Sequence, residues 1–198
     1  MKLDQAKKDI YRRKAKKEGY RSRATFKLLQ IDKKYRIFKR GDIVLDFGCA
    51  PGGWLQYISK IIGSKGFALG IDVKPMKPIA ENVSTLVADV NDLDIGEKIV
   101  KKLPKKTNVV TSDISQSLSG IWELDVARQN YLTLRVIQLF PLIHKRGGSA
   151  VLKIFQGDQF NLLLDKVNQN YRSVMIIKPP ASRPQSSEVY LLCREYIL

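Results

Sequence analysis

The sequence is poor in the side chains from which most metal and nucleophilic sites are built. Its 198 residues include one histidine, His144, and two cysteines, Cys49 and Cys193. A serine–histidine–aspartate triad and a histidine-based metal site are therefore disfavoured, and two cysteines do not suffice for a zinc site or a disulfide scaffold. We expect any catalysis to depend on lysine, aspartate, glutamate and backbone groups, without a metal ion.

Long apolar runs are also missing. No apolar stretch approaches the ~20 residues of a membrane-spanning helix. Residues 1–5 lack the apolar segment of a secretory signal. We therefore expect a cytoplasmic protein with no membrane partner, and we expect it to be a monomer.

Acidic residues are scarce relative to basic ones. The chain has 35 Lys and Arg residues against 19 Asp and Glu residues, a net charge of +16. Residues 1–40 contain 16 basic and 4 acidic residues, or +12, so most of the excess lies in the first fifth. This predicts a polyanionic partner, with nucleic acid favoured over an acidic membrane surface. Tyr11, Tyr20, Phe26 and Tyr35 lie among the basic residues and could stack on bases. The alternative is a solvated basic tail without a defined partner.

Short apolar runs alternate with helical patterns along the rest of the chain. Helices are expected over residues 23–34, 54–62, 95–103, 123–144 and 159–168, with Gly147 and Gly148 ending the long one. Strands are expected over residues 43–47, 66–71, 83–88, 108–112, 149–155, 173–177 and 188–193. The alternation predicts an α/β fold with a doubly wound, mostly parallel seven-stranded sheet and helices on both faces.

The connection between the last two strands predicts an exception to the parallel arrangement. About ten residues without a helical pattern join these strands, whereas a parallel return needs a longer crossover. The last strand is therefore expected to be antiparallel. No internal repeat or second-domain boundary is visible. We expect residues 1–198 to form one domain, with residues 1–40 as a basic N-terminal extension that binds the nucleic-acid partner.

A glycine loop follows the first expected strand and reads Asp46-Phe47-Gly48-Cys49-Ala50-Pro51-Gly52-Gly53-Trp54. Glycines between a strand and a helix let the backbone approach a ligand closely. The loop lacks the Gly-Lys-Ser/Thr of a Walker phosphate loop, and Ala50 and Pro51 interrupt a Gly-x-Gly-x-x-Gly pattern. By itself, such a loop is also compatible with a tight turn.

Aspartates stand at or near the ends of four successive strands, at positions 46, 72, 89 and 113. Ligands of open α/β sheets bind outside the carboxyl ends of the strands, where an acid can accept hydrogen bonds from a ribose. One such aspartate could merely cap a turn, but four favour a ligand site. Acidic strand ends would repel a pyrophosphate, whereas they suit a ribose, an amine and a positive centre. They favour S-adenosylmethionine over a nicotinamide dinucleotide.

Several blocks of this sequence resemble the FtsJ/RrmJ family of ribosomal RNA 2′-O-ribose methyltransferases. They run in the family order from about residue 20 to the C-terminus. Besides the glycine loop, they are Tyr20-Arg21-Ser22-Arg23-Ala24 through Lys27, Ser112-Asp113, Gly147-Gly148-Ser149 through Lys153-Ile154-Phe155-Gln156-Gly157, and Lys178-Pro179-Pro180-Ala181-Ser182-Arg183 through Glu188-Val189-Tyr190.

The resemblance implies a Rossmann-like fold that binds S-adenosyl-L-methionine and releases S-adenosyl-L-homocysteine. It implies 2′-O-methylation of large-subunit, 23S-type ribosomal RNA, at a uridine of the A-loop, with ribosomal RNA or the large ribosomal subunit as partner. The implied catalytic tetrad is Lys27, Asp113, Lys153 and Glu188. The implied donor contacts are Gly52, Trp54, Asp72, Asp89 and Asp113.

One departure from the family pattern concerns the wall beside the target ribose. The family usually has Met-Ala-Pro after its catalytic aspartate, whereas here Asp113 is followed by Ile114-Ser115-Gln116. The choice of RNA therefore stays open. One alternative is a tRNA anticodon-loop 2′-O-ribose methyltransferase. Another is an RNA-binding assembly factor without catalysis, which the intact tetrad disfavours.

The expected topology brings three tetrad members to one rim of the sheet. Asp113 and Lys153 are at the ends of neighbouring parallel strands, and Glu188 begins the antiparallel strand at the same rim. Lys27 must reach this rim from a preceding helix. Lys153 could take the proton of the 2′-hydroxyl, or it could steer the oxygen while water or Asp113 takes the proton.

Overall fold

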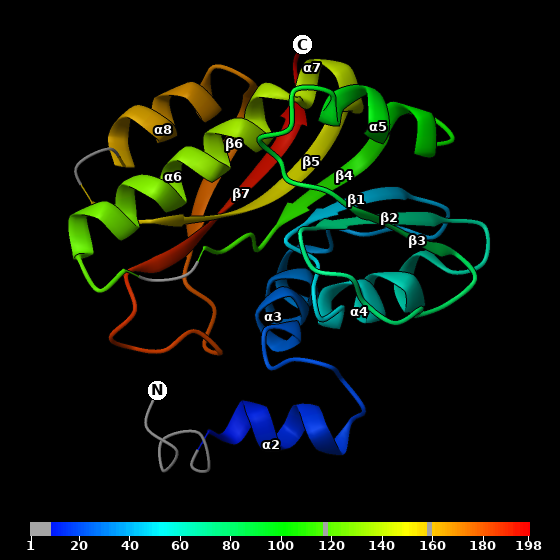
Figure 1. The fold of residues 1–198 in the computed structure, drawn as a ribbon, viewed down its shortest axis with the longest axis horizontal. Coiled ribbons are helices and arrows are strands. Elements are labelled where there is room, and N and C mark those ends of the chain that lie inside the picture. Colours follow the sequence, from blue (N-terminus) through cyan, green and yellow to red (C-terminus); the bar gives the residue numbers. More distant parts are fainter. Residues whose placement is uncertain (1–8, 117–118, 158–159) are drawn as a thin grey trace.

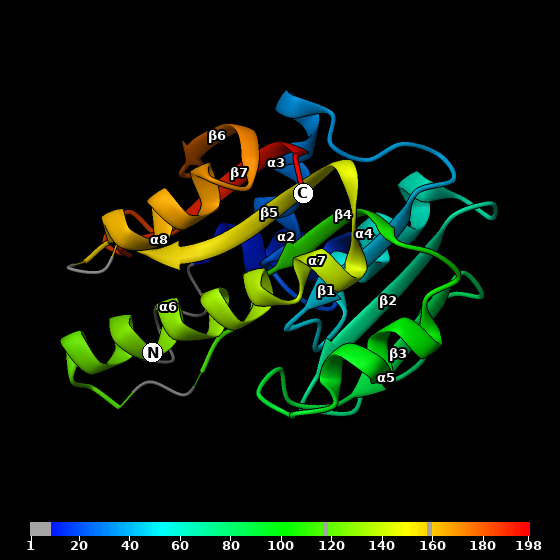
Figure 2. The same cartoon turned by 90° about the horizontal axis from the view of Figure 1, so that it is seen from above.

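The computed structural model describes residues 9–116, 119–157 and 160–198. A seven-stranded sheet lies between two helical layers (Figures 1 and 2). In chain order the elements are α2 (Ile10–Lys17), α3 (Thr25–Tyr35), β1 (Ile43–Phe47), α4 (Gly53–Ile62), β2 (Phe67–Asp72), β3 (Val83–Val87), α5 (Ile95–Lys102), β4 (Thr107–Ser112), α6 (Trp122–Gln138), α7 (Phe140–Ile143), β5 (His144–Phe155), α8 (Phe160–Asn168), β6 (Tyr171–Ile177) and β7 (Glu188–Tyr196).

The strand order is β3-β2-β1-β4-β5-β7-β6, and the strands from β3 to β5 are parallel. β7 is antiparallel to both of its neighbours, β5 and β6. The predicted fold class is therefore confirmed, including the antiparallel last strand. Because β7 lies beside β5, the register places Tyr190 opposite Lys153 and Glu188 opposite Phe155.

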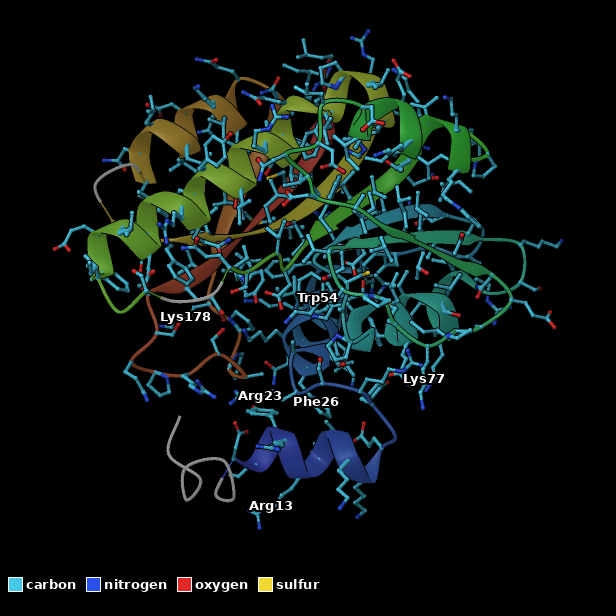
Figure 3. The ribbon with its side chains drawn as sticks, viewed as in Figure 1. Arg13, Arg23, Phe26, Trp54, Lys77 and Lys178 are labelled. Carbon is cyan, nitrogen blue, oxygen red and sulfur yellow. The ribbon has the colours of Figure 1, made fainter. Side chains whose placement is uncertain are left out.

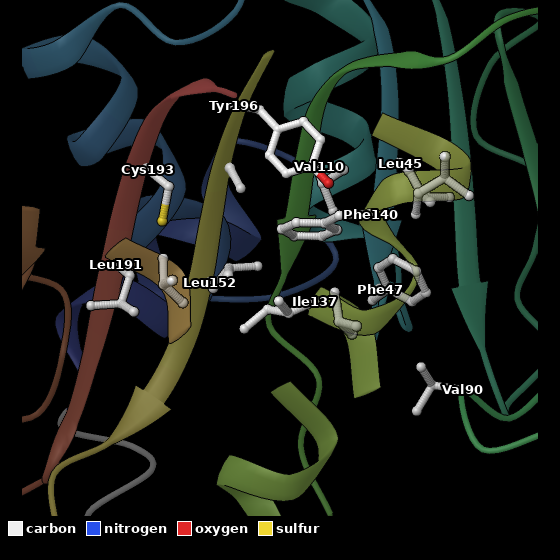
Figure 4. Packing of buried hydrophobic residues seen from close by; sticks show 14 of the residues in the cluster. Leu45, Phe47, Val90, Val110, Ile137, Phe140, Leu152, Leu191, Cys193 and Tyr196 are labelled. Carbon is white, nitrogen blue, oxygen red and sulfur yellow. The ribbon is translucent and has the colours of Figure 1, made fainter. Parts of the chain in front are cut away.

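Two hydrophobic clusters cover the two faces of the sheet. Successive side chains of a strand point to opposite faces, so the central strands contribute to both clusters. Helices α5 to α8 cover one face, over residues that include Leu45, Phe47, Val110 and Leu152 (Figure 4). Helices α3 and α4 cover the other face. Burial on both sides explains why β1 is apolar at almost every position.

The single helix expected over residues 123–144 is wrong at its C-terminal end. α6 stops at Gln138, α7 is a separate short turn with Pro141 near its start, and His144 already belongs to β5. Proline cannot donate a hydrogen bond to the preceding turn and is tolerated at the beginning of a helix. Pro141 therefore starts a new turn.

The glycine pair expected to stop that helix also has a different place. Gly147 and Gly148 lie inside β5, and Gly147 has a φ of 77°. The register between β4 and β5 shifts between Thr107 and Val109, so the strand is irregular at this point. A glycine is suited to this left-handed backbone conformation because it has no Cβ atom.

The basic N-terminal segment is packed against the domain from residue 9 onward, whereas residues 1–8 lie outside the described part. Phe26 is 2% exposed, and the rings of Tyr11 and Tyr20 lie 5.6 and 5.9 Å from it. Arg23 and Phe26 lie between α2 and the domain, whereas Arg13 points outward (Figure 3). The expectation that Phe26 stacks on bases is wrong, because its ring is part of a small core.

Candidate active site

A cavity of about 680 Å³ opens at the carboxyl ends of the parallel strands. Its volume is in the range typical of small-molecule sites. The lining residues come from α3, the glycine loop, the segments after β2, β3 and β4, the exposed side of α6, and β5 and β7. All four predicted catalytic residues line it, as do three of the predicted donor contacts: Lys27, Asp113, Lys153, Glu188, Asp72 and Asp89.

The four tetrad side chains form two ion pairs. Lys153 Nζ lies 3.3 Å from Asp113 Oδ1 and donates a hydrogen bond to the main-chain oxygen of Asp113 at 2.9 Å. Lys27 Nζ lies 2.6 Å from Glu188 Oε1. The Ser182 hydroxyl donates to the same Glu188 oxygen at 2.9 Å. Lys27 therefore does reach the rim from α3, as the tetrad requires.

Tyr190 links the two pairs, and the sequence reasoning missed it. Its hydroxyl donates to Asp113 Oδ1 at 2.8 Å, and Lys27 Nζ lies 5.7 Å from the centre of its ring. The available signal was the two-residue period of a strand. Tyr190 follows Glu188 by two positions and so shares its face of the sheet.

The electrostatic surroundings keep Asp113 ionised. Burial alone would raise the pKa of its carboxyl, since a charged group is less stable away from water. The positive charges of Lys153 and Lys27 and the hydrogen bonds from Tyr190 and Lys153 outweigh this effect, and the pKa of Asp113 lies below its ordinary value. Asp113 is thus an anion that orients cationic and hydroxyl groups.

The donor side of the cavity is formed by the glycine loop and two strand-end carboxylates. Asp72 accepts hydrogen bonds from the backbone N–H groups of Ala50 and Lys74, both at 2.9 Å. Asp89 accepts one from the N–H of Asn91 at 2.9 Å. Within the described residues, neither carboxylate is in an ion pair. Both keep lone pairs that can accept hydrogen bonds from a ligand.

The glycine loop approaches the segment after β4 very closely. Gly48 has a φ of 72°, and a Cβ atom on it would lie 2.4 Å from Ile114 Cα. Only glycine fits this close backbone approach. The loop is thereby held beside Asp113, which explains why glycine is needed at this position of the motif.

Two predicted donor residues do not line the cavity. Trp54 is 3% exposed, and its indole N–H donates to the main-chain oxygen of Ala24 at 2.8 Å. Its side chain holds α4 against the start of α3. Gly52 caps α4 with a φ of 106°. Their contacts with a donor stay predictions.

Asp46, the first of the four strand-end acids, is also not at the rim. It is 1% exposed and accepts a hydrogen bond from Thr111 at 2.6 Å. Burial raises the pKa of its carboxyl well above the ordinary value. The series of aspartates therefore contains one interior member, because β1 continues to Phe47 before the loop begins.

Arg21 is a second residue that the sequence reasoning missed as part of the donor side. Its guanidinium donates to the main-chain oxygens of Pro51, Lys77 and Pro78, at 3.3, 2.7 and 2.7 Å. Its charge therefore stabilises the glycine loop and the segment after β2. No local pattern marks this role, because the acceptors are backbone atoms distant in sequence.

The segment that departs from the family pattern is fixed to α6 by two glutamine amides. Gln129 donates to the main-chain oxygen of Ile114 at 3.0 Å, and Gln116 donates to that of Asp125 at 3.1 Å. Ile114, Ser115 and Gln116 all line the cavity. They form the wall between Asp113 and α6.

Neither a metal site nor a membrane segment is found in the described ranges. In residues 9–116, 119–157 and 160–198, no three or more His, Cys, Asp and Glu side chains are grouped to hold a metal ion. In the same ranges, no helix combines the length and apolar character needed to cross a bilayer.

Comparison with known proteins agrees with this geometry. The FtsJ-like methyltransferase family model matches residues 20–196. A relative from Methanocaldococcus jannaschii, named ribosomal RNA large subunit methyltransferase E, is 42% identical over 97% of this chain and 80% of its own length. A relative of the same name from Methanosarcina acetivorans is 43% identical over 96% of this chain and 69% of its own length.

Solved structures show the same relationship. A Plasmodium falciparum protein assigned as a ribosomal RNA methyltransferase superposes with a TM-score of 0.75 at 30% identity, covering 90% of this chain and 99% of that one. Aeropyrum pernix fibrillarin, solved with bound S-adenosyl-L-methionine, shares the fold with a TM-score of 0.60 at 16% identity, over 88% of this chain and 75% of that one. The chain belongs to the FtsJ-like methyltransferase family.

Proposed function

We propose that this methyltransferase transfers a methyl group from S-adenosyl-L-methionine to a ribose 2′-hydroxyl of large-subunit ribosomal RNA. The observation that carries this proposal is the pair of lysine–carboxylate contacts, Lys153–Asp113 and Lys27–Glu188, at one rim of a donor-sized cavity. The names of the archaeal relatives supply the class of RNA. The resemblance supplies the uridine of the A-loop as the target.

The residues of the cavity fit the donor. Asp72 and Asp89 offer carboxylate oxygens for ribose hydroxyls and an amine, and the glycine loop brings backbone close to them. Neither acid is neutralised by an ion pair within the described residues, so both favour a cationic ligand over a pyrophosphate. When bound, S-adenosyl-L-methionine supplies a methyl group on a positively charged sulfur.

The chain's own residues then have three tasks. Asp113, kept ionised by its neighbours, fixes the Nζ of Lys153 from two oxygen atoms. In its neutral form, Lys153 accepts the proton of the 2′-hydroxyl. In its charged form, it donates a hydrogen bond to the 2′-oxygen and orients it, and water or Asp113 takes the proton. Lys27 and Glu188 hold the ribose in place from the opposite side. The orientation of the reacting atoms is the main contribution of such a site.

The basic N-terminal segment and the cavity bind different substrates, RNA and the methyl donor. Residues 1–40 would bind RNA phosphates as part of a single domain that spans residues 1–198, and the cavity would bind the donor. A cytoplasmic location, a monomeric state and the absence of a metal requirement are parts of the same proposal.

A methyl-transfer assay tests the proposal. The protein is incubated with methyl-labelled donor and, separately, with large ribosomal subunits, free large-subunit RNA and tRNA, and the modified ribose is mapped. We expect label on a 2′-oxygen of the large-subunit RNA. Lys65→Ala removes an exposed lysine of the turn before β2. It is the control for substitution of the tetrad lysine Lys153 and should not affect transfer.

The other outcomes select the alternatives. Label on a tRNA anticodon-loop ribose would replace the ribosomal substrate with tRNA. Binding of RNA without any transfer, under conditions where the donor also binds, would favour the non-catalytic assembly factor.

A further inference from the structure

Trp122 exposes a large aromatic ring at the first turn of α6. The residue is 51% exposed, and its indole is stacked on Phe155 with ring centres 6.2 Å apart and ring planes 8° apart. Its neighbours Ile121 and Leu124 are 59% and 36% exposed. A cluster of exposed apolar side chains marks a binding surface more often than an isolated one does.

This ring stacks on Phe155, the last residue of β5, near the rim of the sheet that holds the catalytic residues. Phe155 follows Lys153 by two residues at the end of β5. Phe155 is also directly opposite Glu188 in β7, and side chains of such pairs are about 5 Å apart. Trp122 therefore contacts the residue of β5 that is paired with a tetrad member of β7.

The support beneath this ring is rigid. Asn130 of α6 is 3% exposed, and its amide accepts from the N–H of Phe155 at 3.1 Å and donates to the carbonyl of Phe155 at 3.2 Å. The end of β5 is thus fixed to the helix that carries Trp122. A ring held in this way loses little conformational freedom when a ligand binds.

We propose that Trp122, supported by Phe155, is a stacking platform for an RNA base next to the methylated ribose. The inference rests on the proposed function and extends it from the ribose to the flanking nucleotide. Bases of single-stranded RNA stack on aromatic side chains, and this stacking tolerates any base because every base has a flat aromatic face.

Charge and burial favour a nucleotide over a purely apolar partner at this surface. The chain has a net charge of +16, and the exposed Arg128, two turns along α6 from Trp122, lines the cavity. Phe26 of the basic N-terminal segment is buried and cannot stack on a base. Trp122 provides the exposed ring that Phe26 does not.

Intrinsic fluorescence tests the platform without any need for turnover. The chain has two tryptophans, and Trp54 is 3% exposed, so Trp122 is the one that a base can reach. We expect a short single-stranded oligoribonucleotide, added in the presence of S-adenosyl-L-homocysteine, to quench the fluorescence of the unmodified protein. The Trp122→Phe variant retains Trp54 and should show no quenching. Equal quenching in both proteins would overturn the proposal.

Methyl-transfer kinetics provide the second test. Trp122→Ala should raise the KM for RNA about 5- to 100-fold, the equivalent of one lost base stack, and should leave donor affinity unchanged. Trp122→Tyr should recover most of the loss. Leu142→Ala, which removes another exposed apolar side chain (48% exposed), is the matched control and should behave like the unmodified protein.

The two proposals fail in different ways. If the unmodified protein methylates RNA and Trp122→Ala has the same KM, the platform is wrong and the proposed function stands. If the unmodified protein transfers no methyl group to any RNA, the proposed function fails. In that case, absence of quenching by the oligoribonucleotide would also refute the platform as an RNA-binding surface.

Discussion

The Nζ atom of Lys153 contacts Asp113 twice, through the side-chain Oδ1 at 3.3 Å and the main-chain oxygen at 2.9 Å. The side chain of Lys153 is only 5% exposed. A lysine amine that contacts two oxygen atoms in a site almost without solvent has a defined position. That position, next to the cavity, makes Lys153 the most informative residue to change.

Lys153→Met should abolish turnover while leaving donor binding intact. Methionine has a similar length but lacks the amine that accepts or directs the proton, a contribution worth about 10²–10⁴-fold in rate. We expect kcat to fall by at least about 100-fold, in line with that range. Equilibrium binding of labelled S-adenosyl-L-methionine should change little, because Asp72 and Asp89 are untouched. Turnover within a few-fold of the unmodified protein would remove Lys153 from the proposed role.

Tyr190→Phe should slow the reaction and change its pH dependence. Burial raises the pKa of Asp113, whereas the charge of Lys153 and the hydrogen bond from Tyr190 lower it. The substitution removes this hydrogen bond. Hydrogen bonds to charged groups contribute about 1.5–3 kcal/mol, so a decrease in kcat of about tenfold or more is expected. The pKa of Asp113 rises without this bond. On the acidic side of the pH profile, the variant should therefore lose activity at a higher pH than the unmodified protein.

Tyr196→Phe is the control for that experiment. Tyr196 is in the same strand, and its buried hydroxyl has no hydrogen-bond partner among the described residues. Removing it should leave both kcat and the pH profile unchanged. Identical profiles for Tyr190→Phe and the unmodified protein would contradict a role for Tyr190 in holding Asp113.

His144 should make the folded state sensitive to mild acid. Burial lowers its pKa from 6.5 to about 4, and Lys145 and Lys106 act in the same direction. As the pH falls below 6.5, the unfolded chain binds a proton that the folded chain accepts only near pH 4. The free energy of unfolding therefore decreases over this range, by up to about 3 kcal/mol for a shift of this size.

Denaturant unfolding at several pH values measures this contribution. The stability of a His144→Gln variant should decrease less steeply between pH 6.5 and 4, because glutamine does not titrate. Other groups titrate equally in both proteins, so the difference between the two curves isolates His144. Parallel curves would contradict the prediction.

Charge substitutions on α2 should weaken RNA binding without affecting the donor site. Deleting residues 1–18 would also uncover Phe26, so replacing exposed charges is the cleaner experiment. The exposed residues of α2 to change to glutamine are Arg12, Arg13, Lys16 and Lys17. RNA affinity should fall, and the slope of log K against log salt should become shallower by about 0.7 for each lost phosphate contact.

A variant with the same loss of charge elsewhere separates local contacts from total charge. Four exposed lysines distant from α2 suit this purpose: Lys101, Lys102, Lys105 and Lys145. If this variant loses as much RNA affinity and salt dependence as the α2 variant, the N-terminal segment has no specific role. Donor affinity should be unchanged in both variants.

Most secondary structure could be predicted because its signals are local. The apolar run of β1 and the glycine loop after it depend on neighbouring residues, and the structure places both where the sequence predicted them. The end of the long helix was missed because apolar residues continue at helical spacing past Pro141. Proline interrupts the helical hydrogen bonds, and this effect outweighs the apolar spacing. The tetrad residues were named from motif resemblance, and strand topology alone could gather only three of them.

By itself, the sequence determined the fold class, the glycine loop and the concentration of positive charge in the first 40 residues, since these are properties of composition and short-range pattern. Tertiary structure alone decided which side chains touch. It placed Tyr190 on Asp113, brought Lys27 to Glu188, buried Phe26 and Trp54, and exposed Trp122 above Phe155. The physical reason is that such contacts join residues distant in the chain, and strand order, register and helix packing set their distances.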